Sequence, residues 1–135
     1  MPSASEQRNL ACVRRLCSSW PKLTRTEFAE VMTPDSRYIN IPWPDQAVTG
    51  PDAAFEFLNY FQTAFEIKLE ILREVAGADV VMSERLETFA RASDGKVMLE
   101  LPVTGVFVMR DGKIAEWRDY FDSAAVAPIM PVPSV

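Results

Sequence analysis

The sequence predicts an α+β domain, in which N-terminal helices pack on a strongly curved, mostly antiparallel mixed sheet with an internal pocket. Apolar residues recur at helical spacing between Leu10 and Phe61, but from Phe65 onward they alternate with polar residues, as in strands with one wet face. Hairpin signals, including Asp94-Gly95, divide this second half. The chain of 135 residues has the length of one domain.

Three helices are predicted in the first half. Residues 3–6 and 24–27 each have the spacing of a capping box, with Ser or Thr followed three positions later by Glu. Pro21 is expected to end the first helix, and residues 34–35 to form a turn after the second. Gly50-Pro51 is typical of a helix start.

Strands account for most of the remaining chain. A short strand is expected at 37–41, and long strands follow from Phe65 and at 79–90, 96–109 and 113–122. Strands of this length twist and curl, and helices across their concave face leave an apolar cavity. Residues 1–135 therefore read as one domain, with a proline-rich tail at about 127–135 that is expected to be extended or mobile.

The composition excludes several classes of function. The net charge of −5 and pI near 4.8 oppose phosphate binding, so nucleic acid is not an expected partner. There is no histidine, which removes Ser-His-Asp and Cys-His catalysis and imidazole metal sites. No run is long enough for a membrane helix, and the polar N-terminus lacks a secretory pattern, so we expect a cytoplasmic protein that does not bind membranes. Cys12 and Cys17 are expected to be free thiols.

Two predicted strands place charged residues among large apolar ones on a single face. Arg85 and Glu87 lie between Val81 and Phe89, and Asp119 lies between Trp117 and Phe121. If these faces line one interior, Arg85 can bridge the two carboxyl groups and hold one as a base and the other as an acid.

Tyr38 and Asn40 also share a strand face, and together they offer donors and acceptors that can orient a water molecule. The same spacings also suit a surface ion pair and an ordinary core tyrosine, so the pattern alone leaves both interpretations open.

Several segments together resemble limonene-1,2-epoxide hydrolase. The resemblance spans about residues 31–122 and is carried most specifically by the last strand. The segments are YxN at 38–40, PxP at 42–44, ERxE at 84–87, GVF at 105–107, DGKI at 111–114 and WRDYFD at 117–122.

The resemblance implies a nuclear transport factor 2-like (SnoaL-like) cone, paired as a homodimer, that hydrates a hydrophobic epoxide to a vicinal diol in one step without cofactor or metal. By position, Asp119 would be the general base, Tyr38 and Asn40 would hold the water, and Arg85 would bridge the carboxyl groups. Glu87 stands where the family has an aspartate as general acid. Its extra methylene moves the carboxyl by about 1 Å, a shift that matters to catalysis.

The many apolar residues (Phe, Leu, Ile, Val, Met and Trp) predict a hydrophobic substrate. The candidate walls, each of which also suits ordinary core packing, are Trp43, Met82, Leu99, Leu101, Phe107 and Trp117. Other functions on the same fold remain open: an isomerase, a polyketide cyclase, an epoxide-opening cyclase, or a binding protein for small molecules without catalysis.

Overall fold

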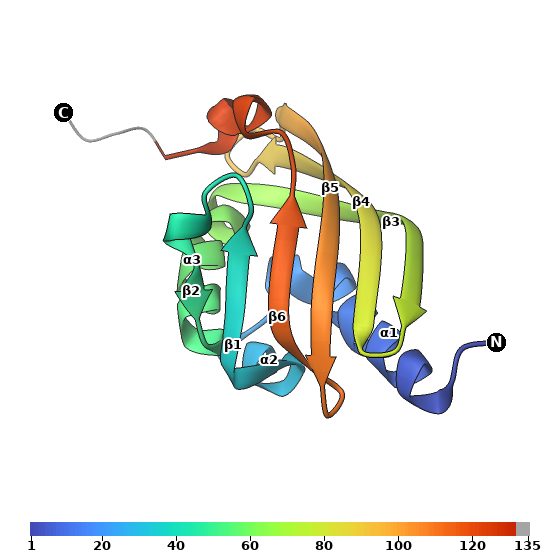
Figure 1. Cartoon of the computed structure of the whole chain (residues 1–135). Coiled ribbons are helices and arrows are strands. Elements are labelled where there is room, and N and C mark those ends of the chain that lie inside the picture. Colours follow the sequence, from blue (N-terminus) through green and yellow to red (C-terminus); the bar gives the residue numbers. More distant parts are fainter. Residues whose placement is uncertain (132–135) are drawn as a thin grey trace.

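The computed structural model describes residues 1–131, so the last part of the predicted tail, 132–135, lies outside the described residues. Figure 1 shows the helices on one side of a six-stranded sheet with the strand order β2-β1-β6-β5-β4-β3. β1 runs parallel to β6, and the other neighbours are antiparallel. The predicted α+β class and mixed sheet are therefore confirmed. The elements are α1 (Ala4–Ser19), η1 (Trp20–Lys22), α2 (Arg25–Val31), β1 (Met32–Asn40), η2 (Pro44–Gln46), β2 (Val48–Thr49), α3 (Pro51–Ala64), β3 (Phe65–Gly77), β4 (Val80–Arg91), β5 (Val97–Arg110), β6 (Lys113–Tyr120) and η3 (Ser123–Ile129).

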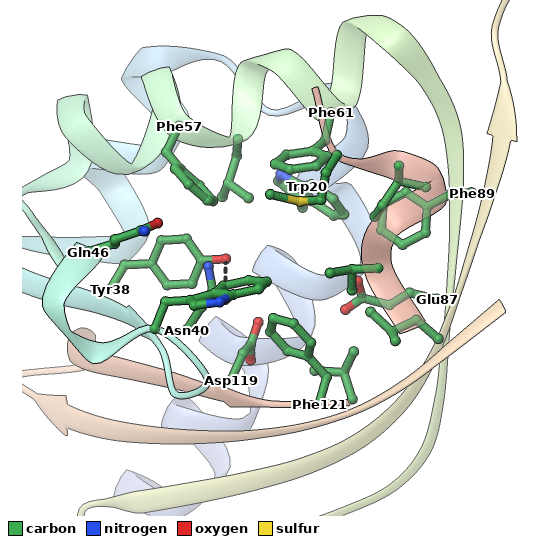
Figure 2. Close-up of a pocket in the computed structure, with 17 residues that line it drawn as sticks. Trp20, Tyr38, Asn40, Gln46, Phe57, Phe61, Glu87, Phe89, Asp119 and Phe121 are labelled. Carbon is green, nitrogen blue, oxygen red and sulfur yellow. Dashed lines mark hydrogen bonds between the residues drawn. The ribbon is translucent and has the colours of Figure 1, made fainter. Parts of the chain in front are cut away.

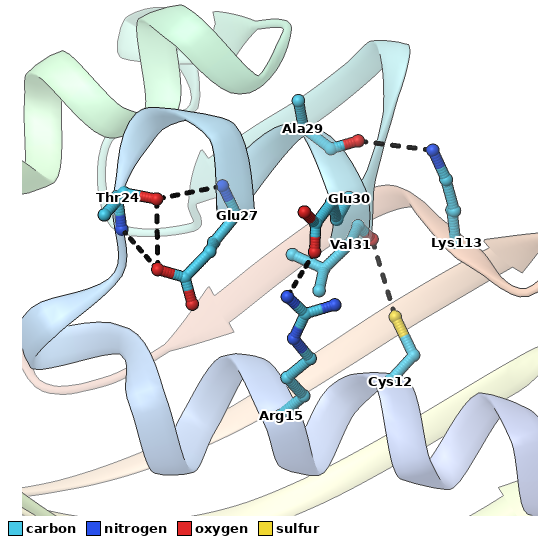
Figure 3. Close-up of polar contacts among 8 residues, drawn as sticks. All are labelled: Cys12, Arg15, Thr24, Glu27, Ala29, Glu30, Val31 and Lys113. Atoms are coloured by element: carbon cyan, nitrogen blue, oxygen red, sulfur yellow. Dashed lines mark hydrogen bonds and ion pairs between the residues drawn. The ribbon is translucent and has the colours of Figure 1, made fainter.

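Both predicted capping boxes are present at the starts of α1 and α2. In the second, shown in Figure 3, the Thr24 hydroxyl accepts from the Glu27 backbone N–H, and the Glu27 carboxylate accepts from the Thr24 backbone N–H. Each cap satisfies backbone donors that would otherwise lack partners, and is worth about 1 kcal/mol. An ion pair between Arg15 and Glu30 links the two helices.

The first strand is longer than predicted. The turn expected at Pro34 and Asp35 is wrong, because both residues lie inside β1. The register between β1 and β6 shifts between Met32 and Arg37. An irregularity of this kind accommodates a proline, which cannot donate to a strand ladder.

The sheet register brings the predicted site residues onto neighbouring strands. Asn40 of β1 pairs with Asp119 of β6, and Asp119 pairs with Gly105 of β5. Gly105 pairs in turn with Ser83 of β4, two residues before Arg85. Because alternate residues share a face, these strands point their polar side chains toward the helices.

The chain after β6 folds into η3, where the Asp122 carboxylate accepts from the Ala124 backbone N–H at 2.9 Å. Val126 and Ile129 of η3 are buried. Residues 127–129 of the predicted tail are therefore helical and not extended. Among residues 1–131, no helix has the length and apolarity needed to cross a membrane.

Candidate active site

A buried ion cluster lies between the sheet and the helices. Arg85 is 1% exposed, Asp119 5% and Glu87 7%. Arg85 Nε and Nη2 donate to Glu87 Oε2 at 3.2 and 3.0 Å, and Nη2 also donates to Asp119 Oδ1 at 3.0 Å. One guanidinium thus bridges the two carboxyl groups, with Nη2 shared between them.

Each carboxyl group keeps one oxygen free of the guanidinium. Asp119 Oδ1 accepts from Arg85 and also from Trp117 Nε1 at 2.8 Å. In the part of the chain that the structure describes, no hydrogen bond reaches Asp119 Oδ2 or Glu87 Oε1. Both residues line a cavity, into which Figure 2 shows their side chains projecting. These two oxygens are therefore available to a bound molecule.

The environment favours the neutral form of Glu87. Burial raises the pKa of Glu87 above its usual value, and the negative charge of Asp119 adds to this, against the opposing effect of Arg85. The pKa of Arg85 stays above its ordinary high value, because Asp119 and Glu87 outweigh the cost of burial. With a proton on Glu87 the cluster has no net charge, which is the cheapest state for three buried ionisable groups.

Tyr38 and Asn40 stand beside Asp119 on the inner face of β1. The Tyr38 hydroxyl donates to Asn40 Oδ1 at 3.1 Å, and the Tyr38 ring stacks on Trp117 with 4.1 Å between ring centroids. Burial raises the pKa of Tyr38 well above its usual value, and the nearby carboxylates contribute, so the phenol stays protonated. The Tyr38 oxygen can then accept, and the Asn40 amide can donate.

A cavity lies beside the cluster and opens to solvent, and its empty volume, including the part open to solvent, is about 600 Å³. Seven of its 17 lining residues are aromatic, and Val126, Ile129 and Met130 also line it. Figure 2 shows the aromatic rings gathered around the carboxyl groups. The labelled aromatic wall residues are Trp20, Tyr38, Phe57, Phe61, Phe89 and Phe121.

The five predicted polar residues converge at this cavity, but only some of the predicted wall residues line it. Trp43 and Leu101 line the cavity. Met82 lies on the opposite face of β4 from Arg85 and is 47% exposed, so it is not a wall. Leu99 and Phe107 are absent from the lining, and Phe107 is instead fully buried against Trp117. Strand alternation shows which residues share a face, but not which part of that face a cavity occupies.

Two features of the site were not predicted. Trp117 was expected only as a wall, but its indole N–H holds Asp119. Gly105 provides the space in which the guanidinium lies, because a Cβ at this position would meet Arg85 Nη1 at 2.5 Å and Asp119 Oδ1 at 3.0 Å. The GVF segment contained this glycine, but no sequence pattern indicates its distance from an arginine on the neighbouring strand.

Comparison with solved structures gives the fold. A SnoaL-like polyketide cyclase candidate from Jannaschia sp. CCS1 is 25% identical, with a TM-score of 0.82 over 99% of both chains. A LEH-like epoxide hydrolase of M. tuberculosis is 22% identical, with a TM-score of 0.72 over 89% of this chain and 86% of that one. An NTF2-like protein of unknown function from Burkholderia pseudomallei K96243 is 16% identical, with a TM-score of 0.76 over 92% and 98%.

The sequence match is more specific than these structural likenesses. The family described as limonene-1,2-epoxide hydrolase catalytic domain matches residues 13–129, which include every element from the middle of α1 to the end of η3. The chain therefore belongs to the limonene-1,2-epoxide hydrolase catalytic domain family and has an NTF2-like α+β fold.

Proposed function

We propose that this protein is an epoxide hydrolase that adds water to a hydrophobic epoxide and releases a vicinal diol in one step. The observation that carries the proposal is the pair of buried carboxyl groups bridged by Arg85, each with one unengaged oxygen at an aromatic cavity. Epoxide opening by water needs a base at the water and an acid at the ring oxygen, and two carboxyl groups in different protonation states supply both.

Asp119 is the base in this proposal. A water held by the Tyr38 oxygen and the Asn40 amide gives one proton to Asp119 Oδ2 as its oxygen attacks a ring carbon. Arg85 and Trp117 both donate to Asp119 Oδ1, so the carboxylate is fixed in position while its second oxygen works.

Glu87 is the acid. As the water oxygen bonds to the ring carbon, that carbon releases the ring oxygen, which takes the proton of Glu87. The raised pKa of Glu87 supports this role, because the neutral carboxyl persists to higher pH. After the reaction Asp119 carries a proton and Glu87 a charge, so returning one proton from Asp119 to Glu87 restores the starting state.

Replacing Glu87 by glutamine is expected to lower kcat by about 10²- to 10⁴-fold, the usual contribution of a positioned acid. The wild-type rate should fall as the pH rises through the raised pKa of Glu87, because the donor proton is then lost. The measurement is diol formation from a panel of racemic aryl, alicyclic and lipid epoxides across pH. Turnover by the glutamine variant within tenfold of wild type would contradict the acid role.

Glu87→Asp is the matched control, since it keeps an acid and restores the residue expected from the family resemblance. It should retain far more activity than the glutamine variant.

Melting curves give a second control. A buried acid whose pKa is higher in the folded than in the unfolded protein stabilises the fold at pH values below its unfolded-state pKa. That stabilisation is lost as the pH rises through its folded-state pKa. The melting temperature of E87Q should therefore rise relative to wild type with increasing pH.

Gly105→Ala is expected to lower kcat by roughly 10²-fold, the scale of a 1 Å displacement at a catalytic group. The added methyl has no room beside Arg85 Nη1, so the guanidinium must move, and both carboxyl groups move with it. Gly77→Ala is the control, because a Cβ there meets no atom within 4 Å. A pH profile unchanged in G105A would show that Gly105 does not position the cluster.

A further inference from the structure

A row of polar residues crosses the inner face of the sheet, from β3 at the sheet edge (Figure 1) to the active site. The register places Glu74 opposite Ser83, Ser83 opposite Gly105, and Gly105 opposite Asp119. Residues paired in this way have their Cβ atoms about 5 Å apart, on the same face of the sheet. Ser83 is fully buried, so the row runs beneath the helices. It leads from a carboxylate on the edge strand to the base of the proposed reaction.

Glu74 joins this row because β3 contains an irregularity. The pairing of β3 with β4 shifts between Ile71 and Arg73. Strand alternation from Ile71 would turn Arg73 toward the helices. The shift turns Glu74 inward instead: its side chain is 16% exposed, and that of Arg73 is 80% exposed. Bulges of this kind re-aim side chains and are frequent next to active sites.

Three buried polar atoms near this row have no hydrogen-bond partner among residues 1–131. They are Glu74 Oε2, Ser83 Oγ and Arg85 Nη1. The three are complementary, because the carboxylate accepts, the guanidinium donates and the hydroxyl can do both. Nη1 lies near Ser83, since a Cβ on Gly105, which pairs with Ser83, would meet Nη1 at 2.5 Å. Rotation about one bond turns the hydroxyl toward either neighbour.

We propose that Glu74 and Ser83 are positioning residues for Arg85, in a relay where Ser83 Oγ accepts from Arg85 Nη1 and donates to Glu74 Oε2. This proposal rests on the proposed function above and concerns the control of the same site. Arg85 opposes the raised pKa of Glu87, so its full attraction would favour loss of the acid's proton. A relay that draws part of this attraction toward Glu74 keeps Glu87 protonated to higher pH, because hydrogen bonds in a chain polarise one another.

The charges that act on Glu87 come from few groups. Arg85 of β4, Asp119 of β6, Tyr38 of β1 and Cys17 of α1 line a common space with it. Burial raises the pKa of Tyr38 well above its usual value and that of Cys17 to about 12, so both stay neutral. Arg85 and Asp119 are therefore the charged neighbours of Glu87, and a change at Arg85 acts on it directly.

Glu74 is held from the other side by α1. Arg14 of α1 donates to Glu74 Oε1, which leaves Oε2 for the relay. After burial, the charges of Asp119, Glu87 and Glu74 also raise the pKa of Cys17, which lies one turn after Arg14. Glu74 is therefore within electrostatic range of the same part of the site as the two carboxyl groups.

Ser83→Ala and Glu74→Gln each remove one link of the relay. In both variants, the fall of kcat at high pH is expected to move to lower pH by about one unit, because Arg85 then favours the ionised form of Glu87 more strongly. Above that fall kcat should be about tenfold below wild type, and below it kcat should be near wild type. KM should change little, since neither residue lines the cavity. An unmoved profile, or a loss of equal size at every pH, would overturn the proposal.

Ser36→Ala and Glu70→Gln are the matched controls. Ser36 of β1 is also fully buried with a hydroxyl that has no partner among the described residues, but it lies outside the row. Glu70 lies on β3 and is exposed. Neither change should move the profile, and a shift equal to that of S83A would contradict the relay.

Two further variants test whether the links act as one chain. Ser83→Thr keeps the hydroxyl and should retain the wild-type profile. The double variant E74Q/S83A should shift the profile no further than either single change, because both remove the same chain. Additive shifts, or a shift in E74Q without one in S83A, would show that Glu74 does not act through Ser83.

Melting curves separate this proposal from the hydrolase itself. The difference in melting temperature between a protein and its E87Q form reports the folded-state pKa of Glu87 without any substrate. In the S83A and E74Q backgrounds, this difference should change at a pH about one unit lower than in the wild type. That shift without hydrolysis of any epoxide would retain the relay and refute the hydrolase. Hydrolysis with no shift in either measurement would refute the relay alone.

Discussion

Replacing Asp119 by asparagine is expected to lower kcat by at least about 10⁴-fold. Two losses combine in this variant. The amide cannot take the proton of the attacking water, and Glu87 becomes the only counter-charge to Arg85, so it ionises and ceases to be an acid. A base and an acid each contribute about 10²- to 10⁴-fold. The measurement is kcat on the best epoxide of the panel, across a range of pH.

The fold should survive this change. The asparagine carbonyl can still accept from Trp117 Nε1, and the charge of Arg85 remains balanced by Glu87. The melting temperature of D119N is therefore expected to stay within a few degrees of wild type. A variant that unfolds, from a parent that opens no epoxide, would indicate that Asp119 is a structural partner of Arg85 rather than a base.

Replacing Arg85 by methionine is expected to destabilise the protein by about 3–5 kcal/mol, the cost of removing one partner from a buried ion pair. Glu87 and Asp119 would be left at 7% and 5% exposure without their common donor. Two carboxyl groups so placed are expected to share one proton, so the loss should deepen as the pH rises. Urea unfolding at several pH values measures it.

Arg85→Lys and a triple apolar variant serve as controls. Lysine keeps the charge but lacks the planar fork, so R85K should recover part of the stability and little of the activity. Replacing all three residues together, as R85M/E87L/D119L, should be more stable than R85M alone, because no buried charge remains. Equal stability of R85M and wild type would contradict the buried cluster.

Sequence signals predicted the fold correctly where residues close to one another in sequence determine the structure. The capping boxes that start at Ser3 and Thr24 and the change of period at Phe65 are satisfied by neighbours in sequence. Pro34 misled because a proline usually breaks a strand, and the irregular pairing that tolerates it depends on β6, about 80 residues away. η3 was missed for a similar reason, since Val126 and Ile129 gain their burial only from the assembled cavity.

The site residues also fall into two groups: those that the sequence pattern indicates, and those whose role depends on residues distant in sequence. Arg85 and Glu87 share a strand face, so alternation placed them side by side, and Asp119 joined them on the condition that the two strand faces line one interior. The family resemblance then assigned their roles. Their contacts are consistent with that grouping. The role of Gly105 was not predicted, because a missing Cβ acquires meaning only from the atoms that lie opposite it in space. The pairing of two chains implied by the family resemblance stays a prediction.

The most direct test of the central claim is a single-turnover reaction in water enriched in heavy oxygen, with enzyme in excess over an epoxide that the protein opens. One-step attack by water predicts that the first turnover yields a diol with one labelled oxygen, and that the Asp119 carboxyl group carries no label. An unlabelled diol would show that the new oxygen came from the protein through an ester. An unlabelled cyclic ether would show that a substrate hydroxyl, and not water, opens the ring.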